Sequence, residues 1–194
     1  MSNAPSKLTP EELLHLALDA TKKDNSESSI EYLKRAIELS PNDGRLHYML
    51  AAEHAQIGMF NEATQEMTLA VQLDPSLHTA HFQLGLLHLT SGRVEQAITA
   101  WTPLDALGED NFLFLFKSGL EHLARDEFAP CIDKLKRGIT LNTLNTALNN
   151  DMQRVINDIQ DKVTDTPTLP PDNDSQPPTA GNHAFITAYT NPKN

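Results

Sequence analysis

Cysteine is nearly absent from this sequence of 194 residues, which contains only Cys131. A single cysteine excludes an internal disulfide framework and fits a reducing compartment. No apolar run approaches the roughly 20 residues that a membrane-spanning helix needs. The first residues also lack the basic region followed by an apolar stretch that marks a secretory signal. We therefore expect a cytoplasmic protein that does not insert into a membrane.

Basic residues are also scarce. Lysine and arginine total 15 against 26 aspartates and glutamates, giving a formal net charge of −11 and a pI near 5.0. A nucleic-acid-binding protein normally carries a basic face, and an anionic membrane surface attracts basic segments. The composition therefore argues against both kinds of partner, although an acidic excess also serves simply to keep a protein in solution.

Recognisable catalytic motifs are missing as well. The sequence shows no glycine-rich phosphate loop after a strand, no convincing strand, and no paired carboxylates that stand apart from ordinary solvated faces. The sequence therefore predicts a protein that is not an enzyme and needs no cofactor.

What the sequence does contain is a pair of amphipathic helices between Gly44 and Pro75. Gly58 permits a backbone conformation that ends the first helix, and Asp74-Pro75 ends the second, because proline cannot continue a helix. Apolar residues recur at helical spacing on both sides of the break. They are Leu46, Met49 and Leu50, then Met59, Phe60, Ala63, Met67, Ala70 and Val71.

The rest of the chain repeats this unit every 34 residues. Ser40-Pro41 aligns with Asp74-Pro75, and small residues such as Ala63, Ala97 and Cys131 fall in one column. A period of 34 with small residues where helices cross resembles the tetratricopeptide repeat (TPR). We place four such repeats at 10–43, 44–77, 78–111 and 112–145.

The resemblance implies an all-α fold, a right-handed superhelical array of helix–turn–helix repeats. Residues 1–9 are expected to be a mobile leader, and 144–163 an amphipathic capping helix that covers the last open edge of the array. Residues 164–194 are rich in proline and are predicted to be a disordered tail, interrupted by an apolar island at 183–189. The apolar stripe expected on the capping helix comprises Leu144, Leu148, Met152, Val155, Ile156 and Ile159.

Three single residues carry further expectations. Trp101 occupies a core column of the repeat and is predicted to be buried. Pro103 follows two residues later and should end that helix early. Cys131 lies in the small-residue column and is predicted to be buried and unreactive.

The eight histidines raise the question of a metal site. His54, His88 and His122 recur at the repeat spacing, and His47 and His81 form a second column. Packed helices lie about 8–10 Å apart, so equivalent residues of successive repeats cannot share one ion. We therefore predict no metal site and expect the histidines to pack between helices.

A concave groove is the functional site that the resemblance implies, lined by the first helix of each repeat. Apolar residues at these positions would form a strip that is seldom left exposed on a monomer. The alternative is that the same residues pack deep in the core of a tight superhelix. The groove residues are Leu14, Leu18, Tyr48, Ala52, Phe82, Leu86, Leu89, Phe116, Leu120 and Leu123.

The predicted function is that of a non-catalytic adaptor or scaffold whose groove binds an apolar peptide or helix of a partner protein. The alternative is a small acidic chaperone of secreted or membrane-inserting clients, similar in architecture to the translocator chaperones of type III secretion. Chaperone-binding TPR proteins clamp a carboxylate with basic and amide residues, but Leu14 and Leu18 replace them here. The groove could instead form a homodimer or hold the chain's own tail through Phe185, Ile186 and Tyr189.

Overall fold

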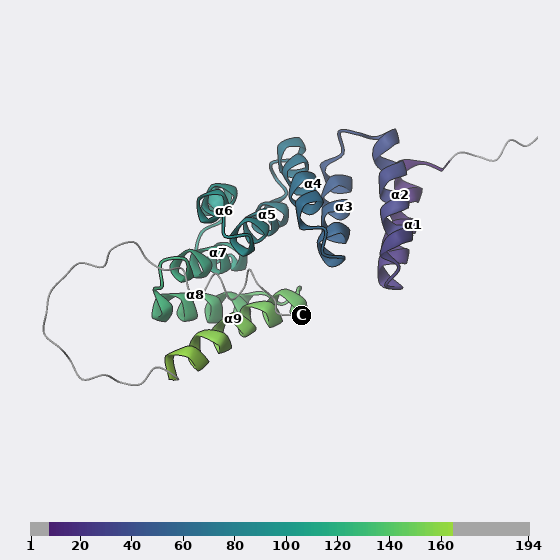
Figure 1. Ribbon diagram of the computed structural model, residues 1–194. Coiled ribbons are helices and arrows are strands. Elements are labelled where there is room, and N and C mark those ends of the chain that lie inside the picture. Colours follow the sequence, from purple (N-terminus) through teal and green to yellow (C-terminus); the bar gives the residue numbers. More distant parts are fainter. Residues whose placement is uncertain (1–7, 165–194) are drawn as a thin grey trace, which may run out of the picture. The chain divides into compact units, whose positions relative to one another are not determined.

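The computed structural model describes residues 8–164, and within that range all regular structure is helical (Figure 1). The chain divides into two compact units, Met1–His88 and Leu89–Asn194. The first contains α1 (Pro10–Lys22), α2 (Ser26–Leu39), α3 (Gly44–Gln56) and α4 (Phe60–Leu73). Helix α5 (His78–Thr90) runs across the division. The second contains α6 (Val94–Trp101), a 3₁₀ helix η1 (Thr102–Leu107), α7 (Phe112–Leu123), α8 (Phe128–Leu141) and α9 (Thr146–Thr164). The predicted all-α repeat fold is confirmed.

The turns within the helix pairs share one backbone feature. Asp24, Gly58, Gly92 and Asp126 all have positive φ values, of 55°, 80°, 73° and 57° respectively. They lie 34 residues apart and each follows the first helix of a pair. Glycine and aspartate are among the residues that enter this left-handed region most readily. The helix break predicted at Ile57-Gly58 is therefore confirmed, and the same turn recurs in each pair.

Local signals account for the helix starts. Thr9 and Glu12 form a capping box, because the Glu12 amide donates to Thr9 Oγ1 at 3.2 Å while the Thr9 amide donates to Glu12 Oε2 at 2.8 Å. Asn25, Asp43 and Asn111 cap α2, α3 and α7 through their side-chain oxygens. Each such cap satisfies a backbone amide that would otherwise lack a partner, which is worth about 1 kcal/mol.

The core of the first unit joins α1, α2 and α3. It contains Leu13, Ala17, Leu33, Ala36, Leu46 and Leu50, each at most 2 % exposed. Helices α3 and α4 approach closely at Gly44, where an added Cβ atom would lie 2.8 Å from the carbonyl oxygen of Ala70. Glycine is therefore required at this contact. Helix α4 ends at Leu73, before Asp74-Pro75, as predicted.

In the second unit, Pro103 changes the course of the chain. Helix α6 stops at Trp101 and the backbone continues as η1, with Pro103 near its start. Trp101 is fully buried, so the predictions for both residues are confirmed. The buried ammonium group of Lys117 on α7 pairs with Asp105 on η1 and with Glu121, 3.0 Å away. The pair with Asp105 links η1 to α7, whereas the pair with Glu121 lies within α7.

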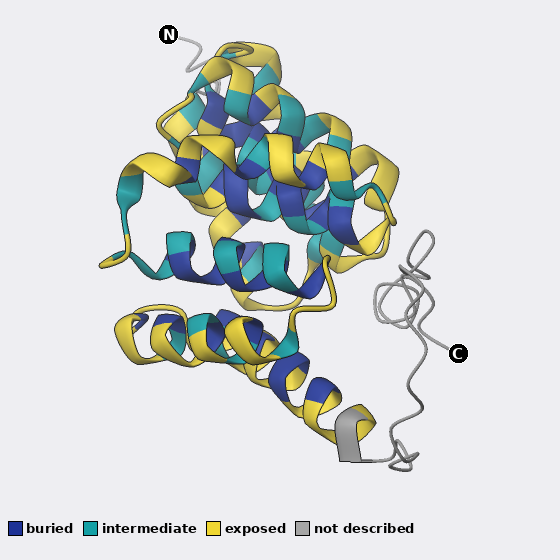
Figure 2. Ribbon diagram, turned by 90° about the vertical axis from the view of Figure 1, so that its left-hand side faces the viewer, coloured by how far each residue is buried: buried dark blue, intermediate teal, exposed yellow. Residues whose placement is uncertain are grey.

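Helix α9 packs against α8 through one face. Leu148, Met152, Val155, Ile156 and Ile159 are buried, and Figure 2 shows buried and exposed residues alternating along the helix. The turn before it is fixed by a buried asparagine. Asn142 donates through Nδ2 to the Asn145 carbonyl at 3.0 Å and to Asn149 Oδ1 at 2.8 Å, and Asn149 Nδ2 donates back to the Asn142 carbonyl.

The prediction for Leu144 was wrong. This residue precedes the helix, which begins at Thr146, and its side chain is 91 % exposed. The side-chain oxygen of Asn142 accepts from the amides of Leu144 and Asn145, so it holds this segment as a turn rather than as a helical extension.

Candidate interaction surface

The accessible part of the predicted groove lies on α1 and α3 in the first unit. Leu18 is 36 % exposed and Ala52 is exposed, while Leu14 and Tyr48 are half-buried beside them. Burial raises the pKa of Tyr48, so its hydroxyl stays protonated throughout the neutral range. The surface these four side chains offer is therefore uncharged and largely apolar.

A buried polar contact joins the two helices that carry this surface. Thr21, one helical turn beyond Leu18, contacts Oε1 of Glu53 on α3 through its hydroxyl and lies 3.0 Å from the hydroxyl of Ser29. Glu53 is 2 % exposed and its second oxygen has no hydrogen-bond partner within the described part of the chain. Buried polar groups favour one arrangement when they are paired and cost stability when they are not. The contact therefore fixes α1 beside α3.

Most of the other predicted groove residues lie in the interior. Phe82 and Phe116 are fully buried, and Leu89, Leu120 and Leu123 are at most 7 % exposed, whereas Leu86 is half-buried. For Phe116 the cause is visible within the second unit, because its ring packs against Gly138 of α8 and edge-on against Phe112, with ring centroids 5.8 Å apart. These side chains match the core-packing alternative. The proposed tail residues Phe185, Ile186 and Tyr189 lie outside the described residues.

Two histidines of the first unit, His47 and His54, are buried packing residues. His47 is buried between helices, with Nδ1 2.7 Å from Glu66 Oε2 and Nε2 3.1 Å from the Pro41 carbonyl. His54 is 5 % exposed, and burial lowers its pKa. Among residues 8–164, no three histidine, cysteine or acidic side chains are grouped to hold a metal ion.

Cys131 is fully buried, as predicted. Burial raises the pKa of its thiol to about 12, and the thiolate is the nucleophilic form of cysteine. This cysteine is therefore not a candidate nucleophile.

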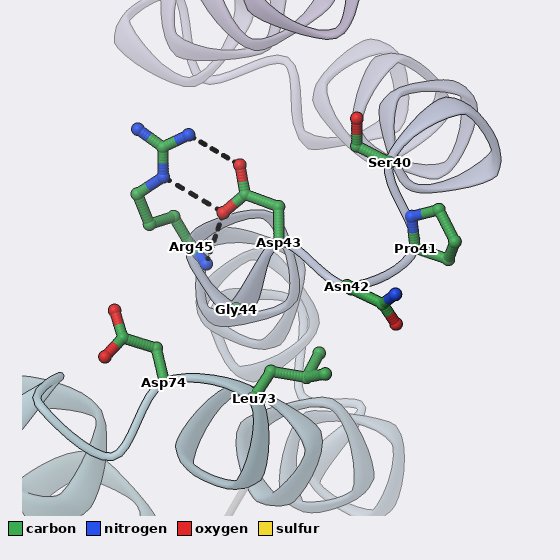
Figure 3. A pocket seen from close by; sticks show the side chains of 8 residues that line it. All are labelled: Ser40, Pro41, Asn42, Asp43, Gly44, Arg45, Leu73 and Asp74. Carbon is green, nitrogen blue, oxygen red and sulfur yellow. Dashed lines mark hydrogen bonds and ion pairs between the residues drawn. The ribbon is translucent and has the colours of Figure 1, made fainter.

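A solvent-open cavity of about 560 Å³ lies where α2 leads into α3 (Figure 3). Asp43 accepts from the backbone amide of Arg45 and from its guanidinium, at distances of 2.6 to 3.0 Å. The guanidinium beside it lowers the pKa of the Asp43 carboxyl. The charges of Asp43 and Arg45 at the edge of the cavity therefore satisfy each other. Its lining is Ser40, Pro41, Asn42, Asp43, Gly44, Arg45, Leu73 and Asp74.

One exposed apolar cluster was missed by the sequence analysis. Ile57 and Met59, in the turn between α3 and α4, and Phe60, the first residue of α4, are 47 %, 39 % and 55 % exposed. Met59 and Phe60 continue the apolar spacing of α4, but the buried side of that helix is formed by Ala63, Met67 and Ala70. We call Ile57, Met59 and Phe60 the tip patch.

Comparison with known families identifies the repeat. Residues 14–43, which span most of α1 and α2, match the family model of the tetratricopeptide repeat. The chain therefore contains a tetratricopeptide repeat at residues 14–43, and its helical fold is that of TPR-repeat proteins. Such repeats generally serve as protein–protein interaction modules and are typically non-catalytic.

Solved structures share the fold of this chain. A crystal structure of MamA matches with a TM-score of 0.58 and 20% identity, covering 68% of this chain and 77% of MamA. The Cut9–Hcn1 hetero-tetramer of the APC/C matches with a TM-score of 0.71 and 17% identity, over 80% of this chain and 30% of that one. A mutant O-GlcNAc transferase of Thermobaculum terrenum matches with a TM-score of 0.55 and 21% identity, over 70% of this chain and 27% of the transferase. No curated protein matches the sequence. Within residues 8–164, no helix has both the length and the apolar character needed to cross a membrane.

Proposed function

We propose that this protein is a non-catalytic adaptor that binds an apolar segment of a partner protein on the exposed face of α1 and α3. The observation that supports it most is the exposure of Leu18 and Ala52 on two helices that the Thr21–Glu53 contact joins. Leu14 and Tyr48 extend the same uncharged surface and are only half-buried. An apolar side chain of the partner, bound here, would bury the solvent-exposed surface of all four residues.

The apolar area that a partner segment can bury on α1 and α3 sets the affinity expected for binding. Burial of apolar surface contributes about 25 cal/mol per Å², and association itself costs several kcal/mol. A few anchored side chains on this face would thus give micromolar binding. Phe82, Phe116 and Leu120 are buried, so they would not touch the partner.

The test is the double variant Leu18→Glu with Ala52→Glu, compared with Leu69→Glu. Leu69 is 42 % exposed on α4 and offers the same kind of substitution away from the proposed face. Partners captured from native lysate are quantified for each variant, and helicity is checked by far-UV circular dichroism. We expect the double variant to lose partners that the native chain and Leu69→Glu both retain. Retention of all partners by a folded double variant would overturn the proposal.

A further inference from the structure

The tip patch presents three large apolar side chains to solvent in one short turn. Ile57, Met59 and Phe60 are separated only by Gly58, whose φ of 80° reverses the chain between α3 and α4. Single exposed apolar residues are common on protein surfaces, whereas neighbouring ones mark interaction sites more often. The tip patch consists of neighbouring apolar residues, so it is a candidate interaction site.

The other three turns of the same protein show that the fold does not require this patch. Each places a residue with positive φ at the position of Gly58, yet carries polar residues at the positions of Ile57 and Met59. The matching residues are Lys23 and Asn25, Ser91 and Arg93, and Arg125 and Glu127. At the position of Met59, Asn25 also caps its helix through the side chain, and Met59 makes no such bond. The second repeat therefore has an apolar turn where the other three have a polar one.

The charges around the patch identify the chemistry of a partner. The helices that flank the patch, α3 and α4, carry no lysine or arginine after Arg45. Glu62 is exposed in the first turn of α4, two residues after Phe60. An apolar patch beside the exposed Glu62, on helices that carry no lysine or arginine after Arg45, is complementary to an amphipathic segment whose polar side is basic.

The chain's own last residues do not fit this description. Residues 165–194 contain Asp165, Asp172 and Asp174 but only one basic residue, Lys193. Their net charge has the same sign as the surroundings of the patch, so the tail of the same chain or of a second copy is disfavoured. We propose that the tip patch docks a basic amphipathic helix of a different protein. This surface shares no residue with the face of α1 and α3, and the inference does not depend on that proposal.

Three synthetic helical peptides test the proposal by fluorescence anisotropy with the full chain. The three peptides have the same apolar face of leucines. Their polar faces differ and carry lysine in one, glutamine in the second and glutamate in the third. We expect the lysine peptide to bind tightest and the glutamate peptide weakest. Glu62→Gln should weaken only the lysine peptide, and the difference should vanish at high salt, because exposed charges are screened there.

A neutral triple variant supplies the matched test of the patch. Ile57→Ser, Met59→Asn and Phe60→Ser use residues that the other turns carry at the same positions, and Gly58 is kept. The variant should lower affinity for the lysine peptide by at least about tenfold, as expected when a binding anchor is truncated. Leu39→Ser is the control, because Leu39 and Phe60 are both 55 % exposed.

Three outcomes would overturn the proposal. They are unchanged binding by the folded triple variant, equal binding of the lysine and glutamate peptides, and no binding of any peptide by the native chain. The variant Leu18→Glu with Ala52→Glu should still bind the lysine peptide, so failure of the adaptor proposal and failure of this one are distinguishable.

Discussion

The ring of Phe116 on α7 occupies the space that a side chain on Gly138 of α8 would need. A Cβ atom on Gly138 would lie 2.5 Å from two ring carbons, and Phe116 is fully buried and cannot move aside into solvent. A residue expected to line a groove is thus the residue that sets the spacing of a helix pair.

Gly138→Ala should therefore destabilise the protein. Alanine gains about 1 kcal/mol of helix propensity over glycine, but overpacking a filled core costs up to about 3 kcal/mol. We expect a net loss of about 1–2 kcal/mol in the free energy of unfolding, measured by urea titration. Phe116→Leu should relieve the clash, so the double variant should be more stable than the sum of the single effects. A stabilising Gly138→Ala would show that α7 and α8 separate easily.

Replacing Thr21 by valine should destabilise the first unit. The shape is kept, but Glu53 loses the hydroxyl that contacts its carboxylate, and a buried polar group without a partner costs about 1–3 kcal/mol. Thr21→Ser keeps the hydroxyl and serves as the control. Unfolding curves of the two variants should separate, and coincident curves would mean that the contact contributes nothing to stability.

His54 should make stability depend on pH. Burial lowers its pKa from the usual 6.5, the charge of Lys34 lowers it further, and Glu66 and Glu62 act in the opposite direction. Since the pKa is lower in the folded chain, the unfolded chain binds the proton first as the pH falls. Stability is therefore complete above about pH 6.5 and is lost as the pH falls toward the folded pKa.

The variant His54→Gln isolates this effect, because glutamine does not titrate and stays neutral at any pH used. The loss of unfolding free energy between pH 7.5 and 5.5 should be smaller for His54→Gln than for the native chain. His15→Gln, at an exposed position of α1, should lose as much as the native chain. Equal losses in all three proteins would assign the pH dependence to other groups.

Cys131 should resist alkylation in the native protein. Its thiol is fully buried and burial raises its pKa to about 12, so little thiolate forms at neutral pH. Iodoacetamide should therefore modify it only after denaturant unfolds the second unit, as followed by intact mass. Fast modification without denaturant would show that α8 opens locally.

Helix limits were predictable because they depend on residues with local effects. Gly58 ends α3, Asp74-Pro75 follows the end of α4, and Pro103 turns α6 into a 3₁₀ helix. Trp101 was placed in the core because its column is apolar in every repeat. These signals act within a few residues, so a single sequence contains them.

The face that each helix presents to solvent was less predictable. Apolar spacing shows that Phe116 and Phe60 lie on an apolar side of a helix, but not whether another helix covers that side. Phe116 is covered by α8, whereas Phe60 projects from the start of α4 and is half exposed. Glu53 gives no local signal of its burial, because its partner Thr21 comes from another repeat.

The absence of lysine and arginine from residues 46–92 also determines which proteases and modifying reagents can act on the second helix pair, α3 and α4. Trypsin cleaves after basic residues, so even the unfolded chain would release α4, α5 and nearly all of α3 as one peptide, residues 46–93. Amine-reactive crosslinkers, acetylation and ubiquitin transfer all require a lysine and therefore have no target there. A partner held at the tip patch would be invisible to lysine crosslinking from this stretch, and carboxylate-directed crosslinking through Glu62 would be the way to detect it.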